Sequence, residues 1–223
     1  MRELSLRLSF ALLLCIVFAG IFAYIATGIQ NETIHRFDHT IIDIVQGWET
    51  PALTPIMKAF TWIGSTTVVI CLIVIGFALL FWVFRKHSQA YFFFFVLIGT
   101  GALNQILKFI FRRERPDFHR LVDISGYSFP SGHTMMAFSL YAISAFIAIR
   151  NLKSIVSKIV VSLLAIIMFA SIAISRIYLG VHYPSDVVGG MAASAFWLII
   201  ATSVYSYYQK RKKQQLDRRF SRQ

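Results

Sequence analysis

Three groups of basic, imidazole, hydroxyl and carboxyl side chains interrupt an otherwise apolar sequence. They are the pair Lys108 and Arg115, the run Pro130-Ser131-Gly132-His133, and the set Ser175, Arg176, His182 and Asp186. A phosphoryl group in transfer spreads negative charge over its equatorial oxygens, and positioned cations stabilise that charge. Arginine offers two donors in a rigid plane, and lysine offers a compact point charge. The cations of these groups are therefore candidate phosphate ligands.

The second group is expected at the start of a helix, because an apolar stretch begins at His133. Backbone N–H groups at a helix N-terminus bind anions, and the Ser131 hydroxyl can add a contact. Gly132 would let the backbone approach a phosphate closely. The sequence offers no acidic cluster to hold a metal. We therefore expect no metal and no other cofactor, so that cations supply the electrostatic stabilisation.

The elements that must position these residues are membrane-spanning helices. Of all residues, 57% are hydrophobic and only 14% are charged, whereas soluble domains average about 25% charged. A span needs about 20 predominantly apolar residues. The first such segment is too long for a signal-peptide core, so we expect it to be retained. The sequence thus predicts an all-α bundle of six transmembrane helices, at 8–28, 66–84, 89–110, 133–149, 155–175 and 187–208.

The segments outside the spans differ in character. Loop 29–65 carries apolar residues at helical spacing in two pieces, which predict two short helices. These helices could lie in the membrane interface or pack as a lid on the bundle, and the loop is a candidate gate for substrate. The polar, basic tail is expected to fray or to lie on anionic headgroups. We expect one membrane domain over 1–208 and a basic cytoplasmic tail over 209–223.

Lysine and arginine also predict the orientation, because cytoplasmic loops are enriched in both. With the N-terminus inside, the C-terminal tail is also inside, and loop 29–65 lies outside with only Arg36 and Lys58. The outer segment 108–132 breaks this rule with several cations, which indicates another use for them. In this topology all three motif groups meet on the extracytoplasmic side of the plasma membrane.

The motif spacing is Lys-x6-Arg-Pro, Pro-Ser-Gly-His and Ser-Arg-x5-His-x3-Asp. The chain thereby resembles the type 2 phosphatidic acid phosphatase family, relatives of the vanadium haloperoxidases, at every motif position. The resemblance implies that His182 is the nucleophile and that Asp186 holds its other ring nitrogen. His133 would protonate the leaving alkoxide and then activate water. The implied phosphate ligands are Lys108, Arg115, Ser131, Gly132 and Arg176.

Residues beside the motifs have simpler interpretations. Asn104 and Gln105 lie one turn from Lys108 and could support the site or form interhelical hydrogen bonds. Gly189 and Gly190 indicate close helix packing. The remaining polar neighbours are interpreted as headgroup ligands or as sources of positive field, and they are Arg112, Arg113, His119 and Arg120.

The resemblance and the six-span form imply a membrane lipid phosphate phosphatase, which would convert phosphatidylglycerophosphate to phosphatidylglycerol. Undecaprenyl pyrophosphate phosphatase is an alternative, because the motifs bind phosphate and do not select the tail. A non-hydrolytic transporter of anionic lipid could use the same cations but would not need two histidines. A rhomboid-type serine protease would need Gly-x-Ser-Gly, which differs from the order found here.

The charge balance bears on partners. A net charge of +12 would suggest nucleic acid in a soluble protein. In a membrane protein basic residues mainly set topology and contact anionic lipids. We therefore expect a phospholipid or prenyl phosphate substrate, the membrane itself and no nucleic acid, and the oligomeric state stays open.

Overall fold

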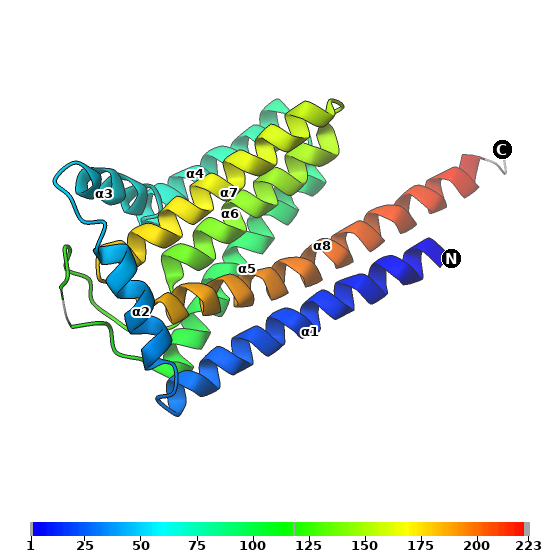
Figure 1. The fold of residues 1–223 in the computed structure, drawn as a ribbon. Coiled ribbons are helices and arrows are strands. Elements are labelled where there is room, and N and C mark those ends of the chain that lie inside the picture. The colour runs from blue at the N-terminus through cyan, green and yellow to red at the C-terminus, as the bar shows by residue number, and fades with distance from the viewer. Residues whose placement is uncertain (1, 118, 221–223) are drawn as a thin grey trace.

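The computed structural model describes residues 2–117 and 119–220, with side chains described at 8–117 and 119–215 (Figure 1). Over these residues the chain is helical and contains no strand. A π-helical turn, η1, continues the fourth helix. The elements are α1 (Arg2–Gln30), α2 (His35–Gln46), α3 (Leu53–Ile63), α4 (Thr66–Ala78), η1 (Leu79–Val83), α5 (His87–Phe111), α6 (Gly132–Asn151), α7 (Ile155–Tyr178) and α8 (Pro184–Phe220).

The predicted all-α membrane bundle is confirmed. Within the described residues, six helices are long and apolar enough to cross a bilayer. Each coincides with one predicted span; the first five differ by at most three residues at either end, and the sixth extends to Gln215 where 208 was predicted. The chain is therefore a multi-pass membrane protein.

Serine caps begin three of the spanning helices. The hydroxyls of Ser65, Ser131 and Ser154 each accept a hydrogen bond from the backbone N–H three residues later, at 3.5, 3.4 and 3.5 Å. Such caps satisfy N–H groups that have no partner within the helix. At the far end of α5, Arg112 adopts a left-handed backbone conformation (φ 46°). This residue turns the chain out of α5 and into the loop that carries Arg115.

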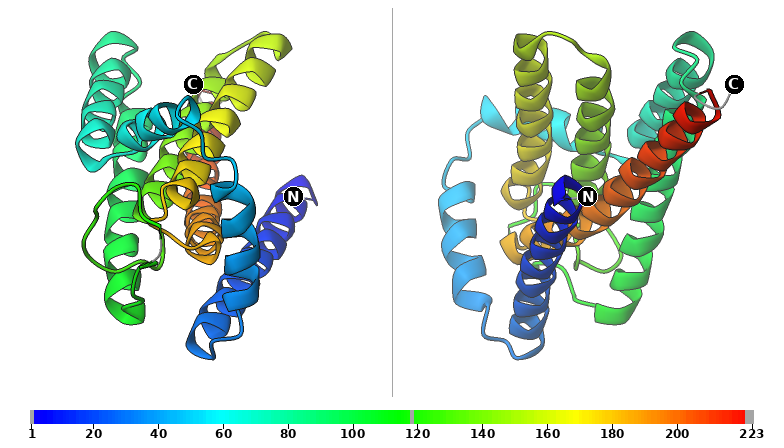
Figure 2. Two further views of the ribbon diagram at one scale, coloured as in Figure 1. Left: turned by 60° about the vertical axis from the view of Figure 1, so that its left-hand side comes forward. Right: turned by 90° about the vertical axis from the view of Figure 1, so that its right-hand side faces the viewer.

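The helices form a bundle in which α4 to α7 make one group, while α1 and α8 run side by side (Figures 1 and 2). The start of α1 and the end of α8 lie at one end of this bundle (Figure 1). The short helices α2 and α3 and the loop between α5 and α6 lie at the opposite end. The loops that carry the three motifs therefore share one end, as the predicted topology requires.

The core between α4, α5, α6 and α8 combines apolar packing with paired polar groups. Val96 and Ile143 are fully buried there. Thr100 Oγ1 of α5 donates to Ser139 Oγ of α6 over 2.9 Å. Trp197 Nε1 of α8 donates to Val96 O over 3.0 Å. Since hydrocarbon offers no alternative partner, such internal pairs satisfy polar groups that would otherwise be costly.

The two short helices predicted in loop 29–65 are present, and they pack differently. Ile42 and Val45 of α2 are buried against residues of α7 and α8, so α2 covers the bundle. Helix α3 has no fully buried residue, and its Trp62 is 66% exposed. Helix α3 also packs on α7, so the lid interpretation describes both short helices, although α3 keeps an exposed apolar side.

The basic C-terminal segment is a continuation of α8. The helix runs from Pro184 to Phe220 without a break, so the expectation of a frayed segment from Gln209 is wrong as far as Phe220. Residues 209–220 contain neither glycine nor proline and are rich in strong helix formers, which favours propagation of the helix. Residues 221–223 lie outside the described part of the chain.

Candidate active site

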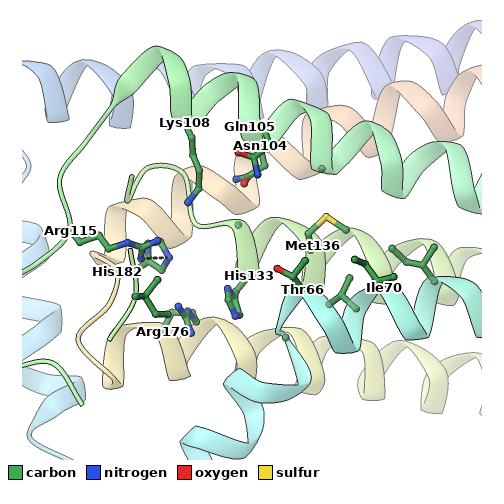
Figure 3. Close-up of a pocket in the computed structure, with 16 residues that line it drawn as sticks. Thr66, Ile70, Asn104, Gln105, Lys108, Arg115, His133, Met136, Arg176 and His182 are labelled. Atoms are coloured by element: carbon green, nitrogen blue, oxygen red, sulfur yellow. Dashed lines mark hydrogen bonds between the residues drawn. The ribbon is translucent and has the colours of Figure 1, made fainter. Parts of the chain in front are cut away.

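The three motif groups meet at the end of the bundle that carries α2 and α3. A cavity of about 330 Å³ lies there, and Figure 3 shows basic and imidazole side chains around it. These side chains come from α5, the loop after it, α6, α7 and the loop before α8. They are Lys108, Arg115, His133, Arg176 and His182.

His182 and Asp186 form a buried pair. His182 Nδ1 lies 3.3 Å from Asp186 Oδ2, and the side chains are 1% and 0% exposed. Asp186 occupies the first turn of α8, where its Oδ2 also accepts from Tyr183 N over 2.9 Å. The carboxylate therefore stabilises the helix N-terminus and faces the imidazole at the same time.

The other ring nitrogen of His182 faces Arg115. Nε2 lies 3.2 Å from Arg115 Nη1, and a guanidinium can only donate. Nε2 is therefore the acceptor, which places the proton of the neutral ring on Nδ1, where Asp186 accepts it. The Nε2 lone pair thus points toward the cations of the cavity, as a nucleophile requires.

Burial keeps His182 neutral. It lowers the pKa of the imidazole from 6.5 to about 3, although the hydrogen bond and charge of Asp186 oppose the shift. The positive charges of Arg176 and Arg115 lower this pKa further. Burial also lowers the pKa of Arg115. A guanidinium starts from so high a pKa that it stays charged at neutral pH.

Arg176 is the most confined cation of the cavity. Its side chain is buried, and its Nη1 donates to Thr61 Oγ1 of α3. Its Nε and Nη2 have no hydrogen-bond partner within the described residues. Because buried donors are rarely unpaired, these two N–H groups are candidate donors to an anionic ligand.

Backbone carbonyl groups hold the other two cations. Lys108 Nζ donates to Tyr127 O over 2.7 Å. Arg115 donates to Gly126 O over 2.9 Å and to Val181 O over 2.8 Å. These acceptors carry no net charge, so they position the cations and leave the positive potential of the cavity intact.

Ser131 has a different place from the one expected. Its backbone N–H donates to Asp186 O over 3.1 Å. Its hydroxyl oxygen accepts from Thr134 N and Thr134 Oγ1, at 3.4 and 3.0 Å. The side chain is fully buried and does not line the cavity. The Ser131 N–H therefore joins α6 to α8 and is not directed at a phosphate, while phosphate binding by its hydroxyl stays a prediction.

Gly132 and His133 line the cavity. A Cβ atom on Gly132 would lie 2.9 Å from Asn104 Oδ1, so a larger residue would displace Asn104. Asn104 Nδ2 in turn donates to Pro130 O over 3.2 Å. Both interpretations of Asn104 therefore apply, because Nδ2 also donates to Met135 Sδ of α6 over 3.1 Å, while its hydrogen bond to Pro130 O supports the loop that precedes α6. Gln105 also lines the cavity.

Sequence reasoning missed the residues that hold Asp186. Arg113 donates to Asp186 Oδ1 over 2.7 Å and to Asp38 Oδ2 over 2.8 Å. Ser128 Oγ donates to Asp186 Oδ2. The interpretation of Arg113 as a headgroup ligand is therefore wrong, because its side chain is 9% exposed and bridges two buried carboxylates.

One signal could have revealed this partner of Arg113. Asp38 lies four residues from both Ile34 and Ile42, and residues at that spacing share one face of a helix. All three are buried. A charged residue on the apolar face of a short helix needs a buried partner. No comparable local pattern marks Ser128.

The other polar neighbours lie outside the cavity lining. Arg112 is exposed. His119 Nε2 lies 2.5 Å from Glu49 Oε2 at the surface. Arg120 donates to Arg115 O over 3.3 Å. The last contact stabilises the loop that carries one cavity cation.

The donor set of the cavity suits an oxyanion. Within the described residues no group of three or more histidine, cysteine, aspartate or glutamate side chains is arranged to hold a metal ion. Cations and N–H donors instead surround a neutral imidazole nitrogen. Such an arrangement can bind a tetrahedral phosphate and accept its phosphoryl group on nitrogen.

Known proteins are similar to this chain in sequence. Residues 89–210 match the PAP2 superfamily. Phosphatidylglycerophosphatase B of Bacillus subtilis is 33% identical over 172 residues, which cover 77% of this chain and 84% of that protein. Decaprenylphosphoryl-5-phosphoribose phosphatase of Mycobacterium tuberculosis is 34% identical over 127 residues, which cover 53% of this chain and 65% of that protein.

A solved structure is similar over most of the chain. The crystal structure of a transmembrane PAP2-type phosphatidylglycerolphosphate phosphatase from Bacillus subtilis has a TM-score of 0.80 and 28% identity, covering 86% of this chain and 96% of that one. Fold, cavity and similarity together define a membrane-embedded phosphate ester hydrolase. The chain belongs to the PAP2 superfamily and is a lipid phosphatase, which confirms the family that the motifs indicated.

Proposed function

We propose that the chain dephosphorylates phosphatidylglycerophosphate to phosphatidylglycerol in the cell membrane. The observation that carries this proposal is the two-part lining of the cavity. Beyond the cations, the lining includes Val69, Ile70 and Ile73 of α4 and Met136 of α6. Figure 3 shows Ile70 and Met136 on the side away from His182. A lipid phosphate suits this shape, because its phosphate reaches the cations while a chain stays among apolar residues.

The apolar part of the cavity also suggests a route of entry. Its lining residues come from α4, α5 and α6, and Ile70 is 54% exposed on the outside of α4. A lipid that enters from the side keeps its chains in hydrocarbon and avoids an extraction cost of about 0.8 kcal/mol per CH₂. The outer ends of α4 and α5 are therefore a second candidate entry point, beside loop 29–65, whose Gly64 also lines the cavity.

In the proposed reaction, His182 Nε2 attacks phosphorus and the bond from phosphorus to the glycerol oxygen breaks. Protonated His133 gives its proton to that oxygen, so phosphatidylglycerol leaves as an alcohol. Neutral His133 then takes a proton from water, whose oxygen attacks the phosphohistidine. The phosphorus–nitrogen bond breaks, its electron pair returns to Nε2, and inorganic phosphate leaves. Asp186 stabilises the charged imidazole.

Substrate choice rests on similarity. The name of the Bacillus subtilis relative, to which 77% of this chain aligns, refers to phosphatidylglycerophosphate. The Mycobacterium tuberculosis relative is named for a decaprenylphosphoryl substrate. A prenyl substrate such as undecaprenyl pyrophosphate is therefore the second candidate for the same site.

A side-by-side assay tests the proposal. Purified protein in lipid–detergent micelles is given phosphatidylglycerophosphate, phosphatidic acid, undecaprenyl pyrophosphate and para-nitrophenyl phosphate, and released phosphate is measured. We expect the highest kcat/KM for phosphatidylglycerophosphate. A higher value for undecaprenyl pyrophosphate would favour the prenyl alternative. Binding without phosphate release from any of the four would favour a transporter.

We also propose that both termini are cytoplasmic and that the site is extracytoplasmic. The distribution of lysine and arginine supports this orientation, as do the start of α1 and the end of α8, which lie opposite the motif loops (Figure 1). Asp117 is exposed on the loop after α5, and its neighbour Phe118 lies outside the described residues. A single cysteine at 117, with Cys15 and Cys71 replaced by serine, should react with an impermeant reagent in intact cells. Protection of that cysteine would reverse the orientation.

A further inference from the structure

A buried network joins α2 to the pair of His182 and Asp186. Arg113 lies between two carboxylates, with Nη1 at 2.7 Å from Asp186 Oδ1 and Nη2 at 2.8 Å from Asp38 Oδ2. Both carboxylates are fully buried. Ser185 completes the ring, because it donates from N and Oγ to Asp38, at 2.8 and 2.7 Å, and accepts from Arg113 over 2.7 Å.

The two oxygens of Asp186 have separate partners. Oδ1 accepts from Arg113, whereas Oδ2 faces Ser128 Oγ, Tyr183 N and His182 Nδ1. The contact with Arg113 therefore fixes the rotamer in which Oδ2 faces the imidazole. The guanidinium is itself held over the Tyr183 ring, 4.0 Å from its centroid.

We propose that Arg113 and Asp38 are positioning residues for the His182–Asp186 pair, which makes α2 a working part of the active site. The inference rests on the proposed phosphatase reaction, in which His182 Nε2 attacks phosphorus. Asp38 acts through Arg113, since it lies on the far side of the guanidinium and does not contact His182. Two buried carboxylates depend on their shared cation, because an uncompensated buried charge is strongly unfavourable.

Charge at this network also acts on the imidazole. Without the positive charge of Arg113, the uncompensated Asp186 carboxylate would favour a proton on His182. Lysine and arginine keep their charge below neutral pH, so a changed acidic limb in a variant reports on the imidazole and carboxyl groups of this network. The charged and titratable groups around the pair, from every packed element, are Asp38 of α2, Lys108 of α5, Arg113 and Arg115 of the following loop, His133 of α6, Arg176 of α7 and Tyr183 before α8.

The first test compares substitutions of Arg113 in the purified full chain on para-nitrophenyl phosphate. For Arg113→Ala we expect kcat to fall about 100-fold while KM changes less than about threefold. In a plot of kcat against pH, the acidic limb of this variant should lie about one pH unit higher than that of the wild type. Arg113→Lys should keep the wild-type limb and recover part of kcat, because an ammonium keeps the charge but cannot span both carboxylates. Arg36→Ala is the matched control, since it removes the same charge from an exposed residue of α2.

The second test asks whether Asp38 acts through Arg113. Asp38→Asn keeps the shape and an acceptor for Ser185, and we expect kcat to fall about 3- to 10-fold. Adding Asp38→Asn to Arg113→Ala should cause little further loss, because the shared guanidinium is already absent. Multiplicative losses would show independent roles and overturn the proposal. The proposal would also be overturned if Arg113→Ala had the kcat of the wild type and an unchanged pH profile.

Two features keep the tests decisive. Should Arg113→Ala fail to fold, wild-type kcat in both Arg113→Lys and Asp38→Asn would overturn the proposal. The positioning role is measured as ratios on a soluble ester, whereas the lipid function is measured by wild-type turnover of phosphatidylglycerophosphate. Either conclusion can therefore fail without the other.

Discussion

Arg115 Nη1 donates to His182 Nε2 over 3.2 Å, so a cavity cation contacts the atom proposed to attack phosphorus. The guanidinium has further donors on the same plane. A phosphoryl oxygen at hydrogen-bond distance from one of these donors would also lie beside His182 Nε2. One side chain can thus orient both reactants, which is the positional contribution expected of an efficient catalyst.

Replacement of the nucleophile is the most direct test of the site. We expect His182→Ala to stay folded and to lose at least about 10³-fold in kcat, because the variant lacks the atom proposed to accept the phosphoryl group. Phosphate release and size-exclusion elution would be measured together. His119→Ala, which changes an exposed histidine, should keep near-wild-type turnover. Substantial phosphate release by His182→Ala would rule out its role.

Asp186→Asn should separate rate from affinity. The amide cannot stabilise the imidazole cation, so kcat should fall on the order of 10²- to 10⁴-fold. KM should change little, since the cavity cations keep their carbonyl partners. Steady-state kinetics on the soluble ester would provide both values. Asp117→Asn, an exposed carboxylate on the neighbouring loop, is the control. A rise in KM without loss of kcat would place Asp186 in substrate binding.

The lowered pKa of His182 predicts the sign of a stability change with pH. The unfolded chain takes up a proton near pH 6.5, whereas the folded chain does so only near pH 3. Above pH 6.5 the group adds no pH dependence. As pH falls from 6.5 toward 3, it reduces the free energy of unfolding by about 1.4 kcal/mol per unit.

His182→Gln provides the comparison for this prediction. The glutamine cannot take up a proton, so its Tm should fall less than that of the wild type between pH 6.5 and 4.5. Thermal unfolding in one detergent at several pH values would measure both slopes. Parallel slopes would mean that His182 is protonated in the folded protein.

The apolar part of the cavity, lined by Val69, Ile70, Ile73 and Met136, can be blocked without changing the cations. Ile70→Trp should lower kcat/KM for phosphatidylglycerophosphate at least about tenfold more than for para-nitrophenyl phosphate, because the indole fills space needed only by a lipid chain. Ile75→Trp is a matched control, since Ile75 is equally exposed on α4 and lies outside the cavity lining. Equal losses of kcat/KM on both substrates would argue against binding of a lipid chain in the apolar part of the cavity.

The cationic cavity predicts how the enzyme responds to chelators and to anions. We expect activity to survive a chelator, because lysine and arginine side chains supply the charge around the phosphate. Orthovanadate should inhibit competitively, since it can adopt the five-coordinate shape of a phosphoryl group in transfer. Phosphate release would be assayed with each reagent in turn. Complete loss with a chelator, restored by a divalent cation, would contradict the proposal.

The features predicted well from sequence are those with local patterns. Each spanning helix follows from a run of apolar residues, and Lys108, His133 and His182 were identified by fixed spacings within short motifs. Their meeting at one end of the bundle followed from the alternation of spans across the membrane. None of these steps required knowledge of which side chains touch.

The features that were missed depend on contacts between distant segments. Arg113 and Asp38 are 75 positions apart, and only the packing of α2 on the bundle brings them together. The sequence predicts that Ser131 offers its N–H to phosphate, but in the folded chain this N–H donates to the carbonyl of Asp186. In both cases a tertiary partner competes successfully for a group that local reasoning leaves free.

Helix α8 links the active site to the opposite surface of the membrane. Its 37 residues span about 55 Å at about 1.5 Å per residue. A bilayer measures about 40–45 Å including headgroups, and a tilt of about 20° shortens the helix only slightly. Since α8 begins beside His182, a helix of this length carries its basic end beyond the far surface of such a bilayer. One continuous helix thus connects the residues beside the catalytic cavity with a basic surface on the other side of the membrane.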